Sequence, residues 1–130
     1  MTPRERAMAA ALDVVLGEYA DPGVFGEFGV TRERFLGRGT PPEVVRAREA
    51  FAWVCCVGLG IKSKRVSEFL GKKSAGAERI QRDRSKARYE ADGPEHGGAS
   101  VREVYDQLLL VTKLQLGTAP RANGRAGVTA

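Results

Sequence analysis

The sequence predicts an all-α protein, a compact helical bundle of about six helices. Strand signals are weak, because no long run alternates between apolar and polar residues and the β-branched residues are scattered. Helix start signals recur, and three segments have the capping-box pattern, a Ser or Thr followed three positions later by Glu. The 130 residues, 42% of them hydrophobic, suit one domain with a modest core.

The first two capping boxes begin the two helices that we expect in the first half of the chain. Thr2-Pro3-Arg4-Glu5 opens a helix over 3–19, and its apolar residues follow at helical spacing. They are Met8, Leu12, Val15, Leu16 and Tyr19. Thr40-Pro41-Pro42-Glu43 opens a helix that runs to about Leu59. Over 51–57 this helix is apolar nearly all round, which is typical of a central, buried helix, and Gly58 and Gly60 mark its end.

Two short helical segments are expected between these long ones. Asp21-Pro22 starts a helix that carries Val24, Phe25 and Phe28 and ends at Gly29. Thr31 caps a helical turn through Phe35 and Leu36, which stops at Gly37 and Gly39.

Three more helices are expected in the second half. Ser63 caps a short helix over 64–70 that ends at Gly71, and Ser74 caps a longer one over 75–90. After a loop at 91–99, the third capping box, Ser100-Val101-Arg102-Glu103, begins a closing helix over 101–116. Its inward residues are Val101, Val104, Tyr105, Leu108, Val111 and Leu114. The chain thus divides into an N-terminal amphipathic helix (1–20), a helical domain (21–116) and a disordered tail (117–130).

Several kinds of chemistry are excluded by the residue counts. The neighbours Cys55 and Cys56 are poorly placed to form a disulfide, and we expect them to be small core residues. His96 is the only histidine, so neither a zinc site nor a catalytic triad is expected. These counts predict a reduced, cytoplasmic protein that is not an enzyme and needs no cofactor. No apolar run is long enough to span a membrane, and the first residues are not typical of a signal peptide.

The positive charge is concentrated in one segment. The net charge is +5, and residues 61–90 hold ten Lys or Arg against four acids, which makes this segment +6 and the rest −1. A solvated helix face is one interpretation. A basic segment in an otherwise balanced chain is better explained by a polyanionic partner, which indicates nucleic acid.

The same segment has the pattern of a helix-turn-helix. A short helix ends at Gly71, a turn follows, and a longer basic helix begins. We expect Val66 and Leu70 to face Ala77 and Ile80 across the two helices. In this arrangement the second helix enters the major groove of DNA, with its first turns nearest the bases.

Basic residues along this segment are candidate DNA contacts. Arg79, Arg82 and Lys86 share one face of the second helix, and the guanidinium group of Arg79 can donate two hydrogen bonds to a guanine. Ser74 starts that helix, where a phosphate can meet the free N–H groups. The remaining candidates are Lys62 and Lys64 at the start of the first helix and Lys72 and Lys73 in the turn. Glu78 either accepts from cytosine or only favours the helix N-terminus.

Residues from about Phe25 to Leu116 resemble the C-terminal DNA-binding domain of the bacterial replication initiator DnaA, which has a Trp-repressor-like fold. The resemblance is carried by the order of four motifs: Val24–Leu36, Val45–Ala50, Ser67–Gly71 and Val104–Leu108. It implies that Arg46 and Arg48 approach the minor groove, although either can instead pair with Glu43 or Glu49 along the helix.

The departures from the family limit what the resemblance implies. The family's recognition helix opens with Gly-Arg-Asp-His-Thr-Thr-Val, whereas this chain has Gly-Lys-Lys-Ser-Ala-Gly-Ala at 71–77. An ATP-binding loop is also missing, so no nucleotide cofactor is expected. The resemblance therefore implies double-stranded DNA binding without replication initiation, and it leaves replication control, transcription and mobile-element functions open.

Two other classes of function remain. The amphipathic helices at 3–19 and 101–116 suit a protein-interaction adaptor or an antitoxin-like module, or a homodimer. RNA binding is less favoured, because Phe69 is an expected core residue and Tyr89 is the only other aromatic residue in the basic segment, whereas unpaired bases need stacking partners.

Overall fold

The computed structural model describes residues 1–17, 30–72, 74–95 and 98–118, and these are almost entirely helical. The helices are α1 (Pro3–Leu16), α3 (Arg32–Leu36), α4 (Pro42–Ala52), the π-helical turn η2 (Trp53–Gly58), α5 (Ser63–Phe69), α6 (Gly76–Ala91) and α7 (Val101–Thr118). Within the described residues β pairing is limited to one isolated antiparallel bridge between Pro94 and Ser100. The predicted all-α bundle is confirmed.

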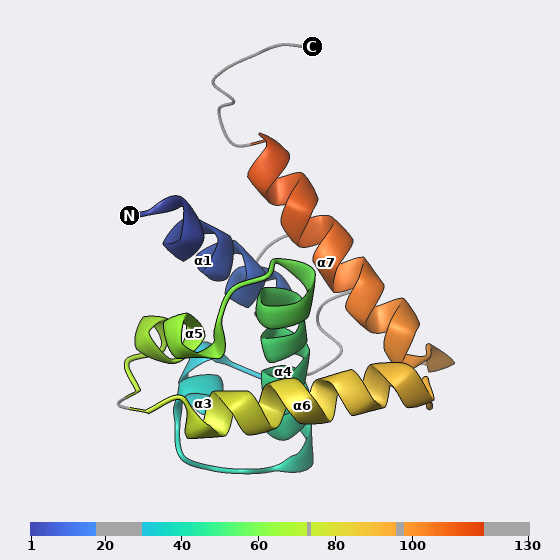
Figure 1. Ribbon diagram of the computed structural model, residues 1–130. Coiled ribbons are helices and arrows are strands. Elements are labelled where there is room, and N and C mark those ends of the chain that lie inside the picture. Colours follow the sequence, from blue (N-terminus) through green and yellow to red (C-terminus); the bar gives the residue numbers. More distant parts are fainter. Residues whose placement is uncertain (18–29, 73, 96–97, 119–130) are drawn as a thin grey trace.

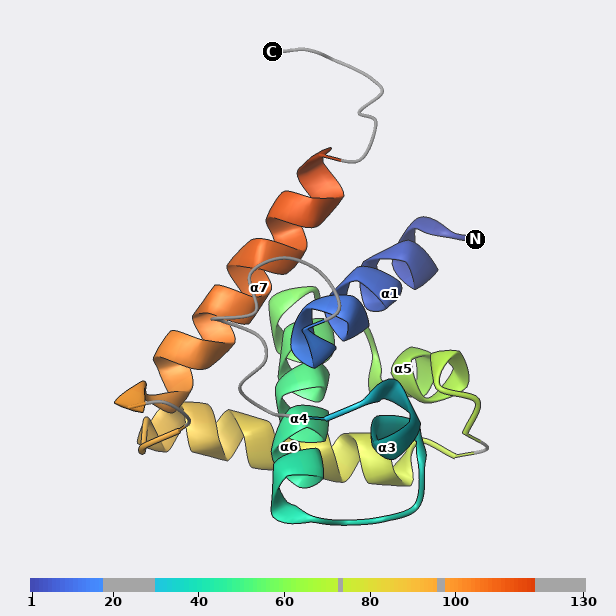
Figure 2. The ribbon, with the colours of Figure 1, turned by 180° about the vertical axis from the view of Figure 1, so that it is seen from behind.

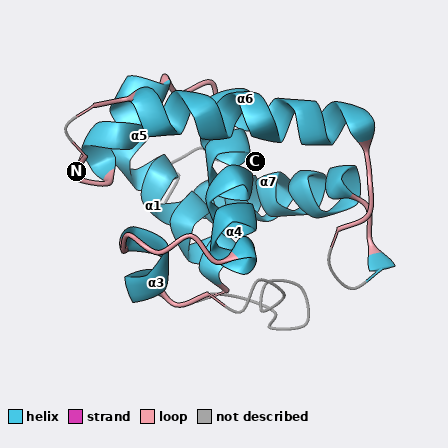
Figure 3. Ribbon diagram, turned by 90° about the horizontal axis from the view of Figure 1, so that it is seen from below, coloured by secondary structure: helices cyan, strands magenta, loops and turns pink. Residues whose placement is uncertain are grey.

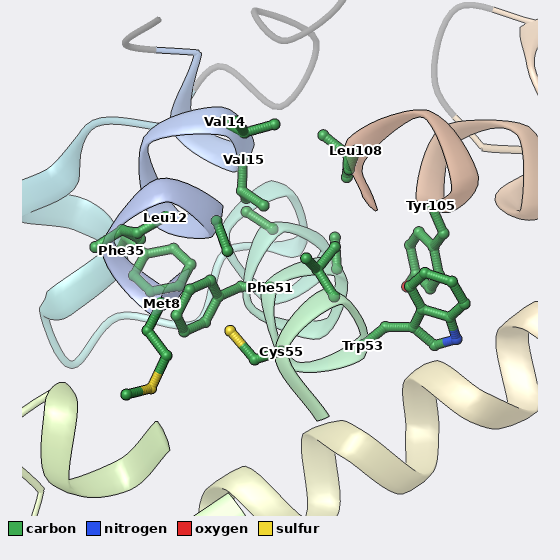
Figure 4. Close-up of a cluster of buried hydrophobic side chains, with 14 of the residues drawn as sticks. Met8, Leu12, Val14, Val15, Phe35, Phe51, Trp53, Cys55, Tyr105 and Leu108 are labelled. Atoms are coloured by element: carbon green, nitrogen blue, oxygen red, sulfur yellow. The ribbon is translucent and has the colours of Figure 1, made fainter. Parts of the chain in front are cut away.

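Helix α4 stands at the centre of the bundle. Figures 1 and 2 show α1 and α7 beside one another against α4, while α6 crosses the first half of α4, in front of it in Figure 1, and α3 and α5 lie to one side. Figure 4 shows the core that results, with Phe51 and Cys55 of the central helix surrounded by side chains of α1, α3 and α7. The expected inward residues Met8, Leu12 and Val15 of α1 belong to this core, so α1 is part of the same folding unit.

The central helix widens into a π-helical turn at its end. The Leu59 N–H bonds to the Val54 carbonyl at 2.9 Å, five residues back, instead of the usual four. The Trp53 ring at the start of this turn stacks on Tyr89 of α6 (centroids 4.8 Å apart) and packs against Tyr105 of α7 at 5.3 Å. Three aromatic rings thereby join three helices. The ring of Tyr89, also covered by Arg102, is not free to stack on a nucleic-acid base.

Two of the three predicted capping boxes are confirmed. The Thr2 Oγ1 accepts from the Glu5 N–H at 3.1 Å, and Glu5 Oε1 accepts from the Thr2 N–H at 2.8 Å. Ser100 and Glu103 make the same reciprocal pair at the start of α7. Thr31 also caps α3 as expected, by accepting from the Arg34 N–H.

The other predicted caps are wrong. Pro41, not Thr40, precedes α4, and a proline side chain has no acceptor for a capping hydrogen bond, while the carboxylate of Glu43 pairs with Arg34 at 2.6 Å. Ser63 and Ser74 do not cap either. Ser63 is the buried first residue of α5 after Lys62, and α6 begins at Gly76 after Ala75.

Helix α7 extends beyond its expected end, and one of its residues faces the other way. The expected tail begins at 117, but α7 continues to Thr118. Leu114 was expected to point inward and is 56% exposed, whereas Val101, Val104, Tyr105 and Leu108 are buried. The short helix expected after Asp21, Tyr19, and the tail beyond Thr118 lie outside the described residues.

The two cysteines are free thiols, as expected. Cys55 is fully buried in the core and Cys56 is half-buried. Burial raises the pKa of Cys56 to about 11 and also raises that of Cys55. Because the thiolate is the reactive form, both thiols are unreactive at neutral pH.

Candidate nucleic-acid interface

Helices α5 and α6 are joined by a tight turn that the sequence pattern located correctly. Gly71 has φ +77°, a conformation that glycine adopts without steric cost. The Lys72 N–H bonds to the Ser67 carbonyl at 2.9 Å, and the buried Ser67 hydroxyl donates to the Ser74 carbonyl at 2.5 Å. These bonds tie the end of the turn back to α5 and fix where α6 begins.

The face of α6 that packs on the protein is not the one expected. Ala77 and Ile80 are exposed, Ile80 by 52%, and the prediction that they pack against α5 is wrong. The buried residues of the helix are Glu78 and Ser85. The Ser85 hydroxyl donates a hydrogen bond to the Arg82 carbonyl at 2.7 Å. This small polar residue can therefore lie against the bundle without an unpaired polar group.

Glu78 is a buried carboxylate beside the turn. It is 1% exposed, and its Oε2 lies 3.0 Å from Lys72 Nζ. Within the described residues the two groups form an ion pair without a well-directed hydrogen bond to the carboxylate. Glu78 therefore cannot reach a cytosine, and the contact with its carboxylate holds the Lys72 ammonium close to the turn.

A hollow of about 260 Å³ lies between α5 and the first turn of α6. Its cationic side chains are Lys64 from α5, Lys72 from the turn and Arg79 from α6. Glu68, Ser67, Ser74 and Ala75 complete the lining. Three of the sequence-predicted bases are thus gathered around one depression, with a single carboxylate among them.

The other basic residues of α6 lie along its surface, and Figure 3 shows this helix spanning one side of the molecule. Lys86 is exposed and, seven residues after Arg79, lies on the same flank. Arg82 is only half-exposed, with its Nε bonded to Asp83 at 3.0 Å. Arg84, which sequence reasoning did not single out, is exposed on the opposite flank. Helical spacing from Arg79 misses Arg84, because Arg84 is neither three nor four residues away. It could be found only by knowing which face of α6 is buried.

Arg48 is a structural residue, contrary to the interpretation that it approaches the minor groove. It is 8% exposed, and its guanidinium group donates hydrogen bonds to four backbone carbonyls at the end of α3 and in the following loop. The acceptors are Phe35 (3.0 Å), Gly39 (2.8 Å), Arg34 (3.2 Å) and Gly37 (2.7 Å). It does not pair with Glu43 or Glu49, which are bound to Arg34 and Arg88.

Arg46 is separated from the α5–α6 hollow. It is half-buried and lines a depression of about 380 Å³ with Arg88, Pro94 and Glu95, near the C-terminal end of α6. Arg88 there pairs with Glu49 at 2.8 Å and with Glu95 at 2.6 Å. The depression therefore carries its own carboxylates. Lys62 and Ser74 are accessible near α5, and Lys73 lies outside the described residues.

Comparisons with known proteins give no assignment. No family model matches the chain, and neither the curated proteins nor the solved structures contain a significant match. The resemblance to the DnaA domain therefore stays a prediction that depends on the four motifs. Among the described residues there is no cluster of potential metal ligands and no helix with the length and hydrophobicity to cross a membrane.

Proposed function

We propose that this protein binds double-stranded DNA through α5 and α6, which act as a helix-turn-helix with α6 in the major groove. The observation that carries the proposal is the hollow between these helices, where Lys64, Lys72 and Arg79 surround the first turn of α6. Phosphates of DNA are recognised by such clusters, and the first turns of a recognition helix are the part nearest the bases.

Phosphate neutralisation supplies most of the affinity in this proposal. Arg79 and Lys86 extend along one flank of α6, and Lys64 and Lys62 lie at the beginning of α5. Together with Arg84 and the turn lysines they can make about four to seven phosphate contacts. Each contact displaces condensed counterions, so affinity falls steeply as salt increases.

The outward face of α6 supplies the base contacts. Ala77 and Ile80 are exposed there, opposite the buried Glu78 and Ser85. Apolar side chains on a recognition helix contact the methyl group of thymine. This gives the exposed isoleucine, which the core does not use, a function in selecting the site.

Replacement of thymidine by deoxyuridine tests this reading of the α6 face. For the tightest duplex selected from a random pool, we expect wild type to bind the deoxyuridine version about fourfold more weakly, the value of one buried methyl group. An Ile80→Ala variant should bind both versions equally. Equal binding by wild type, measured by fluorescence anisotropy, would exclude Ile80 as a thymine contact.

The proposed function itself is tested by a salt series. Fluorescence anisotropy of a labelled random 20-base-pair duplex should give micromolar or tighter binding near 0.1 M salt. The logarithm of the binding constant should fall linearly with the logarithm of salt, with a slope of about −4 to −6. If the folded protein does not bind duplex DNA at low salt, the proposal is refuted. If it binds single-stranded RNA more tightly than duplex DNA, the RNA alternative replaces the proposal.

One observation favours the protein-interaction alternative. Leu110 and Leu114, one helical turn apart on α7, are each more than half exposed. An adaptor that uses this face would bind its partner at high salt and would not respond to duplex DNA. The same salt series therefore separates the two functions.

A further inference from the structure

A second, smaller hollow of about 170 Å³ lies beside α5, on the side of the N-terminus. Three cationic side chains line it together with Gly60 and Ile61, namely Arg4 of α1, Lys62 immediately before α5, and Arg65 of α5. We propose that this hollow takes a phosphate of the DNA backbone and extends the interface from α6 to the start of α1. The inference rests on the proposed function, because the phosphate belongs to the same bound duplex.

The fold brings these residues together from distant parts of the sequence. Gly60 has φ +69° and reverses the chain after the π-helical turn, and the Ile61 N–H bonds back to the Cys55 carbonyl at 2.9 Å. Lys62 then stands immediately before α5. Figures 1 and 2 show the first turn of α1 on the same side of the bundle as α5. Sequence reasoning did not find this site, because Arg4 lies outside the basic segment at 61–90.

The charge balance of the hollow favours an anion. None of the described carboxylates lines it, whereas a neighbouring hollow of about 190 Å³ that shares Arg4 and Arg65 contains Glu5 and Glu68. Glu5 is engaged by the Thr2 N–H, and Glu68 lies 3.2 Å from Arg65. Arg4 and Lys62 have no ion-pair partner within the described residues. Arg65 is already paired with Glu68, so Arg4 and Lys62 supply the uncompensated positive charge that favours a phosphate in the hollow.

Helix α5 lies between this hollow and the proposed interface and contributes a cation to each. Lys64 lines the depression that faces α6, while its neighbour Arg65 lines the one that faces α1. The first turn of α5 thus carries cations toward both sides. A DNA strand held against the first turn of α6 can follow this line of cations past α5 to Arg4.

The test compares Arg4→Ala with Arg6→Ala, a change two residues further along α1. Both side chains are exposed, but Arg6 does not line the hollow. Loss of one phosphate contact should make the salt slope of duplex binding about 0.9 less steep and weaken binding about eightfold at 0.1 M salt. We expect this for Arg4→Ala only. If the two variants have the same salt slope while the wild-type protein binds duplex DNA, the inference is overturned and the proposed function still stands.

A second measurement without DNA separates failure of the site from failure of the function. Inorganic phosphate is added at constant ionic strength, and the midpoint of thermal unfolding is followed for wild type and both variants. A smaller stabilisation of Arg4→Ala than of Arg6→Ala supports an anion site in the hollow. If that difference appears while duplex binding is unaffected by Arg4→Ala, the hollow binds free phosphate and its assignment to the DNA backbone is wrong. If wild type binds no duplex, the proposed function and that assignment both fail.

Discussion

Replacement of Arg48 with methionine is expected to lower the free energy of unfolding by about 3 kcal/mol. The side chain is buried and donates to four backbone carbonyls between residues 34 and 39. A hydrogen bond to a charged group contributes about 1.5–3 kcal/mol, and the exposed part of this loop can recover some of the loss from water. Urea denaturation followed by circular dichroism measures the change, and the midpoint of thermal unfolding should fall by about 10 °C.

Arg46→Met is the matched control for this prediction. Arg46 lies two residues earlier on α4 and is half-buried, and no backbone acceptor holds it among the described hydrogen bonds. We expect its loss to change stability by less than about 1 kcal/mol. Equal destabilisation by the two substitutions would show that Arg48 does not anchor the loop after α3.

The combined substitution of Arg79 and Lys86 by alanine should produce the largest change in DNA affinity. The two side chains are exposed on one flank of α6, and Arg79 also lines the hollow beside α5. If each contacts one phosphate, binding at 0.1 M salt weakens on the order of fiftyfold and the salt slope becomes less steep by about 1.8. Fluorescence anisotropy with a random duplex measures both quantities.

Lys113→Glu controls for net charge, because it also lowers the net charge of the protein by two, removing one positive charge and adding one negative charge. Lys113 is exposed on α7, away from the α5–α6 hollow. Its substitution should leave the slope nearly unchanged. A loss of affinity as large as that of the double variant would mean that binding depends on overall charge and not on α6.

The parts of this fold that sequence predicts well depend on short-range interactions. Thr2 with Glu5 and Ser100 with Glu103 are three residues apart, so the pattern alone locates the starts of α1 and α7. Gly71 is similarly local, because the tight turn after α5 needs a positive φ there. The same reasoning failed at Thr40, because α4 begins one residue later with Pro41 before it, and Glu43 pairs with Arg34, a partner brought close by the tertiary fold.

The orientation of α6 was beyond sequence reasoning for the same reason. Ile80 is the most hydrophobic residue of the helix and was expected to face inward, yet it is exposed. Glu78 takes a buried position because Lys72 stands 3.0 Å from its carboxylate, and Ser85 takes another because its hydroxyl is satisfied within the helix. A ranking by hydrophobicity would bury Ile80 and expose Glu78 and Ser85, which is the opposite of the observed burial. The candidate bases could be named from the charge pattern, but the hollows that gather them required the packing of α1, α5 and α6.

The most direct test of DNA binding by α5 and α6 is a nuclear magnetic resonance titration of the folded protein with duplex DNA. We expect backbone amide signals to shift at the first turns of α6, along α5 around Lys64, and near Arg4. The exposed face of α7 around Leu110 and Leu114 should be unaffected. Shifts confined to α7, or no shifts at low salt, would contradict the claim that α5 and α6 form the DNA-binding surface.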